Sequence, residues 1–249
     1  MGPHVLVVGG TKGIGRAVAR RLAADDQIVS VIGRSAPARD DDGRIKSWAV
    51  DVADLAALSA TLERIVGSDG PLSGAVLLQR YRAGGDDWAG EFATSVAATR
   101  ALIEWAGAHF EDRGRGKAIV IVSSIASRYV ALEQPVSYHV AKAAMSQMVR
   151  YYAVALGRQG VRINGICPGT VVKDESRAFY AAHPEIEALF RAIVPLGRMG
   201  TSEDVAELAT FLLSERAAFL TGQNIVLDGG VSLQSHESMA RRVAGGEVG

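Results

Sequence analysis

The sequence has a single cysteine, Cys167, so the chain cannot form an internal disulfide. Its position in an apolar run favours a buried packing role over a reactive thiol. No apolar stretch approaches the length of a membrane-spanning helix, and the N-terminus enters an apolar strand without a charged leader or a cleavage site. We therefore expect a cytoplasmic protein without a membrane partner.

Charge of either sign is not in excess. Lys and Arg together number 27, as do Asp and Glu, which gives a formal net charge of zero over 249 residues. A neutral chain creates no strong overall field, so we expect no nucleic-acid partner, and we assign no metal site. No Pro/Ser-rich linker, charge block or internal repeat divides the chain. We expect one domain over residues 1–230, followed by a C-terminal tail over 231–249.

Apolar runs alternate with helical patterns along the chain. Some runs are continuous enough to be strands buried on both faces of a sheet. Strands are predicted at 4–8, 28–32, 46–50, 74–78, 118–122, 161–166 and 224–227. Helices are predicted at 14–24, 54–66, 88–109, 137–157 and 203–213, with a helical insertion around 175–192. This alternation predicts an α/β fold in which helices cover both faces of a parallel sheet.

A glycine-rich turn joins the first strand to the first helix. Gly9, Gly13 and Gly15 follow the spacing GxxxGxG. Glycines let the backbone turn tightly and approach a pyrophosphate, whose charge is stabilised by free N–H groups at the helix N-terminus. The turn alone is weak evidence, because glycines also occur in ordinary strand-to-helix connections.

Tyr138 and Lys142 are four residues apart in a predicted helix, so their side chains share one face. A neighbouring ammonium group favours the phenolate form of a tyrosine, which suits it to acid–base chemistry. Such a pair also occurs on many ordinary helices, and its meaning depends on the glycine turn and on a Ser-Ser pair upstream.

Taken together, these motifs resemble the short-chain dehydrogenase/reductase family, in its compact branch of about this length. The resemblance covers nearly the whole chain and implies a Rossmann-like doubly wound sheet of seven parallel strands that binds NAD or NADP at the strands' C-terminal ends. The matching segments are 9–15, 51–52, 121–124, 138–142, 162–169, 195–198 and 220–230.

The resemblance also implies the reaction centre. Tyr138 is the general acid in carbonyl reduction, Ser124 donates a hydrogen bond to the substrate oxygen, and Lys142 binds the nicotinamide ribose and assists Tyr138. Hydride arrival leaves negative charge on the substrate oxygen, so a hydroxyl donor and a proton source must both point at it. Ser123 is the competing serine, but strand alternation turns it to the other face.

The end of the second strand bears on the choice of dinucleotide. It reads Gly33-Arg34-Ser35, without the acidic residue that holds the adenosine ribose in NAD-preferring relatives. Arg34 can bind a 2′-phosphate through a charge-assisted fork, with Lys12 and Ser35 in support, so NADP is predicted in preference to NAD. The alternative is that both cations are solvated loop residues. The full predicted cofactor set is Gly9, Thr11, Lys12, Gly13, Ile14, Gly15, Arg34, Ser35, Asp51, Val52, Tyr138, Lys142, Pro168, Gly169 and Val171.

Three departures from the family pattern affect the mechanism. Leu77–Arg80 replaces an Asn-Asn-Ala-Gly segment, Ser95 stands where an asparagine helps to hold a proton-relay water, and Lys173 replaces a threonine near the nicotinamide. Ser95 has a shorter reach, so we expect a rearranged relay. Several cations in segments that surround the site in relatives predict a basic pocket for an anionic substrate, with surface placement as the alternative. They are Arg80, Arg82, Arg128, Lys173 and Arg177.

The sequence thus predicts an NADP-dependent oxidoreductase that interconverts a secondary alcohol and a ketone. One alternative is a sugar-type epimerase or dehydratase that uses the same Tyr-Lys site, and another is a non-catalytic dinucleotide sensor. Helix 137–157 is apolar around much of its circumference, from Val140 to Leu156. Such a helix must be covered on two sides, so we predict a homodimer or homotetramer.

Overall fold

The computed structural model describes residues 3–35, 43–82, 86–111 and 116–245. Its centre is a seven-stranded parallel sheet with the order β3-β2-β1-β4-β5-β6-β9, which confirms the predicted fold class. The strands are β1 His4–Val8, β2 Ile28–Gly33, β3 Ile45–Ala49, β4 Gly74–Leu77, β5 Lys117–Val122, β6 Val161–Pro168 and β9 Asn224–Leu227. Each coincides with a predicted strand to within two residues at either end. Cys167 is buried in β6.

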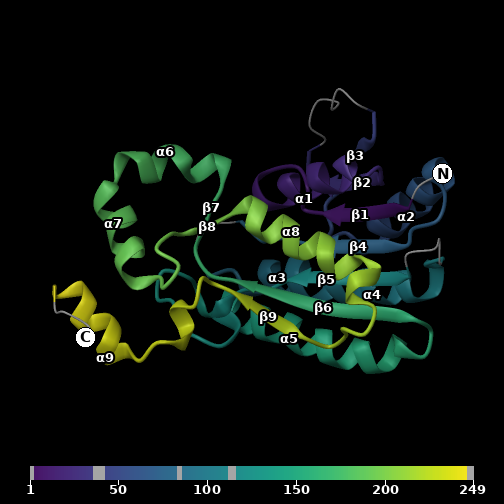
Figure 1. Cartoon of the computed structure of the whole chain (residues 1–249). Coiled ribbons are helices and arrows are strands. Elements are labelled where there is room, and N and C mark those ends of the chain that lie inside the picture. The colour runs from purple at the N-terminus through teal and green to yellow at the C-terminus, as the bar shows by residue number, and fades with distance from the viewer. Residues whose placement is uncertain (1–2, 36–42, 83–85, 112–115, 246–249) are drawn as a thin grey trace.

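Helices cover both faces of this sheet (Figure 1). Side chains alternate along each strand, so in β1 Leu6 and Val8 join one core while Val5 and Val7 join the other. The first core is closed by α2 Leu55–Asp69, α4 Ala98–His109 and α5 Val136–Gly157. The second is closed by α1 Gly13–Ala24 and α8 Ser202–Leu213. We call the sheet and these five helices the sheet body.

The predicted helix at 88–109 is continuous but not uniform. It consists of α3 Trp88–Glu91, a π-helical turn η1 Phe92–Ala97, and α4. Asp87 caps α3 by accepting a hydrogen bond from Gly90 N. π-helical turns are rare and concentrate at functional sites. This one contains Ser95 and packs against α5, which carries Tyr138 and Lys142.

A second group of elements stands away from the sheet body, at the left of Figure 1. It contains α6 Asp174–Ala182 and α7 Pro184–Ile193, which replace the single insertion predicted around 175–192 because Pro184 begins a new helix. The two-residue strands β7 Val171–Val172 and β8 Gly200–Thr201 pair where the chain leaves and rejoins the body. The remaining element, α9 His236–Val243, contacts α7. We call these five elements the projecting part.

The segment expected as a tail therefore contains a helix. It also begins with the 3₁₀ turn η4 Val231–Leu233, and residues 246–249 lie outside the described residues. The other 3₁₀ turns are η2 Ile125–Ser127 and η3 Glu215–Ala217. In the part of the chain that the structure describes, no helix is long and apolar enough to cross a membrane.

Candidate active site

The glycine turn lies between β1 and α1, at the carboxyl edge of the sheet. Gly9 and Gly13 have φ values of +84° and +49°, which favour glycine. A Cβ at Gly15 would lie 2.3 Å from the Gly9 carbonyl oxygen, so only glycine fits there. The first helical bond runs from Arg16 N to Lys12 O, which leaves the N–H groups of residues 13–15 without partners inside the helix.

An anionic side chain already approaches this turn. A Cβ at Gly13 would lie 3.1 Å from Glu175 Oε2, which places the Glu175 carboxylate beside the N-terminus of α1. A carboxylate at this position stands in for a phosphate, because free N–H groups and the positive end of the helix dipole favour any anion. The turn therefore fits the pyrophosphate of a dinucleotide.

Two hollows extend from this turn along the carboxyl edge of the sheet. One hollow, of about 300 Å³, is lined by residues that were predicted to bind the adenosine half of the cofactor, including Asp51. The N-cap of α2 is Asp54, so Asp51 does not fill the alternative role of a helix cap. The predicted residues that line this hollow are Gly9, Thr11, Lys12, Arg34, Ser35, Asp51 and Val52. The other, of about 180 Å³, contains those predicted for the nicotinamide half, namely Ile14, Gly15, Tyr138, Lys142, Pro168, Gly169 and Val171. The structure thus brings the set together, and the individual roles stay predictions.

The two serines after β5 have different environments. Ser123 is buried, donates to the Lys142 carbonyl at 2.9 Å, and accepts from Ser146 Oγ at 3.0 Å, so it joins β5 to α5. Ser124 lines the nicotinamide-side hollow with Tyr138. Its hydroxyl oxygen accepts from Ala126 N at 3.1 Å, which leaves its proton free to be donated. Ser124 is therefore the serine suited to bind a substrate oxygen.

Tyr138 and Lys142 lie one helical turn apart in α5, as predicted. The Lys142 Nζ atom is 5.6 Å from the centre of the Tyr138 ring, and the Arg80 guanidinium carbon is 5.0 Å from the same centre. Two cations therefore face the phenol ring. Burial lowers the pKa of Lys142 to about 8, while the Glu91 carboxylate acts in the opposite direction.

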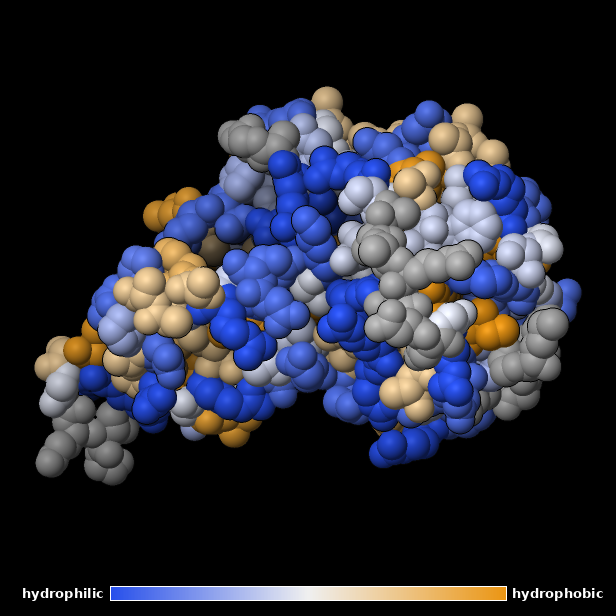
Figure 2. Space-filling model, turned by 90° about the horizontal axis from the view of Figure 1, so that it is seen from above, coloured by the Kyte–Doolittle hydropathy of each residue, from blue (hydrophilic) through white to orange (hydrophobic). Residues whose placement is uncertain are grey.

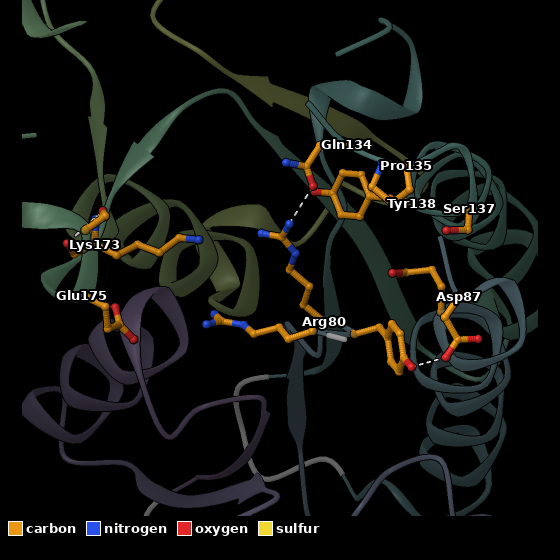
Figure 3. A pocket seen from close by; sticks show the side chains of 12 residues that line it. Arg80, Asp87, Gln134, Pro135, Ser137, Tyr138, Lys173 and Glu175 are labelled. Atoms are coloured by element: carbon orange, nitrogen blue, oxygen red, sulfur yellow. Dashed lines mark hydrogen bonds between the residues drawn. The ribbon is translucent and has the colours of Figure 1, made fainter. Parts of the chain in front are cut away.

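A cavity of about 530 Å³ opens in front of Tyr138, between the sheet body and the start of α6. Seen from above, hydrophilic side chains gather around the hollow between the two parts (Figure 2). Lys173 and Arg80 extend into the cavity from opposite elements, and Arg80 donates to Gln134 Oε1 at 2.7 Å (Figure 3). Arg82 also lines it. Burial, then Arg80 and Arg82, lower the pKa of Lys173.

Both cations and carboxylates line this cavity. Its lining includes Asp87, Glu91 and Glu175 as well as the three cations. Each carboxylate has another contact: Asp87 accepts from the Tyr81 hydroxyl, Glu91 accepts from Ser95, and Glu175 lies at the glycine turn. The Tyr81 contact lowers the pKa of Asp87. Arg80 and Arg82 also line both of the hollows that contain the predicted cofactor residues, and Lys173 lines the one that contains Tyr138.

Two predicted substrate residues lie elsewhere. Arg128 is exposed just after η2, and Arg177 is exposed on α6, where it forms an ion pair with Asp174 at 3.1 Å. Neither lines the cavity. An arginine side chain is long enough to reach solvent from most surface positions. The location of Arg128 and Arg177 in segments near the site therefore did not determine where their side chains point.

The residues that depart from the family pattern have different surroundings in the structure. Leu77 is buried in β4, and Gln79 is buried and donates to Thr99 Oγ1 at 2.6 Å. Ser95 is fully buried and donates to Glu91 Oε1 at 2.5 Å. Lys173 is the N-cap residue of α6 and lines the cavity.

Sequence reasoning missed Glu91, Tyr81 and Gln134 as residues of the cavity. For Glu91 a signal was available. It precedes Ser95 by four residues in a predicted helix, which places both on one face in the same way as Tyr138 and Lys142. Tyr81 and Gln134 lie in connecting segments, where the sequence has no period that indicates direction.

Known proteins resemble this chain over most of its length. The family model described as enoyl-(acyl carrier protein) reductase matches residues 8–232. The 2-(S)-hydroxypropyl-CoM dehydrogenase 3 of Xanthobacter autotrophicus is 32% identical over 246 residues, covering 92% of this chain and 96% of that protein. The inactive 2-(S)-hydroxypropyl-CoM dehydrogenase 2 of the same organism is 37% identical over 198 residues, covering 75% and 85%. A solved structure of ElxO with NADP bound has a TM-score of 0.82 at 24% identity, covering 94% and 100%.

Proposed function

Because the chain belongs to the short-chain dehydrogenase/reductase family of oxidoreductases, which act on alcohol groups, we propose that it interconverts a secondary alcohol and a ketone with NADP as cofactor. The observation that carries the proposal is the position of Ser124, Tyr138 and Lys142 around one hollow that continues into the glycine turn. The hydroxypropyl group named for one relative is itself a secondary alcohol.

When bound, NADPH would supply a hydride to the carbonyl carbon, and NADP⁺ would accept one from the alcohol in the reverse direction, while the residues of this chain manage the charge on the substrate oxygen. Ser124 donates a hydrogen bond to the carbonyl oxygen, keeps its own proton, and holds that oxygen near Tyr138. As negative charge develops on that oxygen, the Tyr138 hydroxyl gives up its proton to form the alcohol. The Lys142 ammonium stabilises the resulting phenolate. In the oxidation direction Tyr138 acts as the base.

Arg34 supports the preference for NADP over NAD. It follows β2 in the hollow predicted for adenosine, with Lys12 and Ser35 in the same lining. No acidic residue stands at positions 33–35, so a 2′-phosphate meets cations and hydroxyl groups there.

The substrate is proposed to carry a carboxylate, phosphate or sulfonate. Arg80, Arg82 and Lys173 line the cavity in front of Tyr138, and within the described part of the chain none of the three forms an ion pair with a carboxylate. Burial and its cationic neighbours lower the pKa of Lys173, so a bound anion would relieve repulsion among the three.

A panel of matched ketones tests this proposal directly. Each ketone is offered with NADPH or NADH, once with an anionic group and once as its neutral amide or ester. We expect oxidation of NADPH with the anionic members and weak turnover of the neutral ones. Equal turnover of both would contradict the anionic substrate, and no turnover with any member would contradict the dehydrogenase function.

A non-catalytic dinucleotide sensor is the second candidate. One observation favours it: a relative that is 37% identical bears the name of an inactive dehydrogenase. Tight NADPH binding without turnover of any ketone or alcohol would support this candidate.

Self-association is part of the proposal. The outer side of α5 exposes Val136, Val140, Tyr151 and Val154, the last at 83% of its surface. A second copy that covers this face would bury apolar area in a homodimer or homotetramer. Light scattering at micromolar concentration is expected to give a multiple of the chain mass of 26.2 kDa, and a stable monomer would contradict it.

A further inference from the structure

The side chain of Arg80 is held at both ends. Arg80 follows β4, and the residue before it, Gln79, is buried and donates to Thr99 Oγ1 at 2.6 Å, which fixes the backbone at this point. At the other end, Nη2 of the guanidinium group donates to Gln134 Oε1 at 2.7 Å (Figure 3). A long side chain loses rotamer freedom when it is held in this way. The guanidinium group therefore has a set position, although Arg80 is an exposed residue.

That position is against the ring of Tyr138. The guanidinium carbon of Arg80 lies 5.0 Å from the ring centre, closer than the Nζ atom of Lys142 at 5.6 Å. A guanidinium group stacks on an aromatic ring because the ring face carries partial negative charge. Arg80 and Tyr138 also line the same cavity and the same nicotinamide-side hollow. An anion bound by Arg80 would thus lie beside the group proposed to protonate the substrate oxygen.

Gln134 is itself fixed, by a turn that is tied to α5. Its backbone N–H donates to the Ala131 carbonyl at 3.0 Å, and Ala131 N donates to His139 Nε2 at 3.0 Å. Because a backbone N–H can only donate, Nε2 accepts, and the proton of the neutral ring is on Nδ1, which donates to the Pro135 carbonyl at 3.0 Å. The turn is therefore attached to the first turn of α5, which also carries the phenol that Arg80 faces.

The group that holds Arg80 is neutral. A carboxylate in place of the Gln134 amide would orient the guanidinium group equally well but would compensate its charge. In the residues that the structure describes, Arg80 forms no ion pair, and the carboxylates of the cavity have the other contacts given above. An arginine also has more N–H donors than one glutamine can use. The charge and the remaining donors of Arg80 thus stay available to a ligand in the cavity.

We propose that Gln134 is a positioning residue for substrate selection: it holds Arg80 against the Tyr138 ring with the arginine charge uncompensated, so that Arg80 binds an anionic group close to the reacting carbonyl. The substrate is accordingly a short oxo acid, in which the anionic group lies near the ketone rather than at the far end of a long chain. The inference deepens the proposed function and rests on it for the reaction. The position of Arg80 and its response to anions concern this chain alone and are measured without turnover.

The ring signal of Tyr138 reports the position of Arg80 without substrate or cofactor. The chain has six tyrosines, so tyrosine labelled with ¹³C in the ring gives a small set of NMR signals, and the signal lost in Tyr138→Phe is that of Tyr138. The probe anion is propionate, and propionamide is its neutral match. In the unaltered protein we expect propionate, but not propionamide, to move the Tyr138 signal in a saturable manner at constant ionic strength.

Two substitutions of Gln134 separate orientation from charge. Gln134→Glu keeps the size and the acceptor for Arg80 but compensates the guanidinium charge, so the Kd for propionate should rise about five- to tenfold. Gln134→Met keeps the length without an amide acceptor, so Arg80 is released from the ring. The Tyr138 signal should then shift even without propionate, and the Kd for propionate should rise about threefold.

Leu132→Glu is the matched control, because it adds the same charge to the same turn at a side chain that is 90% exposed. It leaves the acceptor of Arg80 in place, so the Kd for propionate and the Tyr138 signal should stay nearly unchanged. Combining Arg80→Gln with Gln134→Glu completes a double-mutant cycle. Once Arg80 is absent, Gln134→Glu should have little further effect on propionate binding.

Kinetics extend the test to the reaction. With a short anionic ketone, Gln134→Glu should raise KM about five- to tenfold and leave kcat within about twofold, because Tyr138 and Ser124 are unchanged. The neutral amide of the same ketone should show no such rise. An equal rise in KM for an acid whose anionic group lies at the far end of a long chain would overturn the assignment of a short oxo acid.

The proposal as a whole is overturned if propionate gives no saturable shift in the unaltered protein, if Gln134→Met leaves the Tyr138 signal in place, or if Gln134→Glu weakens propionate binding no more than Leu132→Glu does. It also fails if the Gln134 variants raise the Kd for NADPH and not that for propionate, which would assign Arg80 to the cofactor. The proposed function fails separately: the expected signals in a protein that reduces no ketone support the role of Gln134 and reject the dehydrogenase.

Discussion

The sheet body and the projecting part differ in how they are held together. The helices of the sheet body bury apolar side chains in two cores, whereas α6, α7 and α9 contain no buried residue among those that the structure describes. Tyr138 and Lys142 lie on α5 and Ser124 follows β5 closely, whereas Lys173 is the N-cap residue of α6 and Glu175 lies in its first turn. The groups proposed to carry out the chemistry are thus placed on or beside packed elements, while Lys173, which is proposed to bind the substrate, lies beside an element with few buried contacts.

Replacing Tyr138 with phenylalanine tests the chemical role of the body and should have the largest effect. The change deletes the proton donor without touching the glycine turn, so we expect turnover to fall by roughly 10²- to 10⁴-fold while the Kd for NADPH stays the same. Steady-state kinetics and a fluorescence titration measure the two quantities. Lys142→Ala, in contrast, should impair both. Full turnover in Tyr138→Phe would remove this residue from the mechanism.

The same leucine-to-alanine change in each part compares their packing. Leu62 in α2 is 2% exposed, so its truncation should lower the free energy of unfolding by about 2 to 5 kcal/mol. Leu189 in α7 is 42% exposed, and its truncation should cost about 0.5 kcal/mol or less. Urea unfolding of both variants gives the values. Equal costs would mean that the projecting part is as tightly packed as the body.

Arg34→Asp addresses cofactor choice at the edge of the body. It removes a phosphate partner and adds repulsion, so NADPH binding should weaken by roughly 1 to 3 kcal/mol. NADH lacks the 2′-phosphate and serves as the control ligand, for which a much smaller loss is expected. If the unaltered protein binds NADH and NADPH equally, the role assigned to Arg34 is wrong.

The smallest effect is expected where the two parts meet. Lys173→Thr or Arg80→Gln should raise KM for an anionic ketone about tenfold, or about 1.4 kcal/mol, with little change for a neutral analogue. Arg177→Gln is the matched control, because Arg177 lies on α6 outside the cavity. A rise in the Kd for NADPH instead of KM would assign Arg80 or Lys173 to the cofactor.

The sequence predicted the body better than the projecting part, and the reason is physical. A strand buried on both faces is a continuous apolar run, so β1 was predicted with its observed bounds, as was the partly buried edge strand β9. The strands β7 and β8 have two residues each, too few for any period. Helix α9 packs against the neighbouring helix α7 and contains no buried residue, and its charged sequence His236–Val243 has no broad apolar stripe.

In the candidate site, too, the sequence predicted only the features that are local patterns. Glycine spacing and the Tyr138–Lys142 interval are local patterns, so the sequence contained them. Which cations and carboxylates line the cavity depends on the directions of long side chains that come from separate elements. Local sequence patterns do not specify these directions. The π-helical turn that carries Ser95 was likewise invisible, because one inserted residue hardly changes the periodicity of a helix over 88–109.

The position of β9 in the sheet has a consequence for synthesis of the protein. β9, at residues 224–227, pairs with β6 at the outer edge, so the ribosome synthesises β6 and α8 before the strand that closes that edge. Until then, the edge of β6 that faces away from β5 has unpaired backbone N–H and C=O groups. Such an exposed strand edge is a surface on which nascent chains aggregate. Truncation before residue 224 is therefore expected to yield aggregates rather than a smaller folded enzyme.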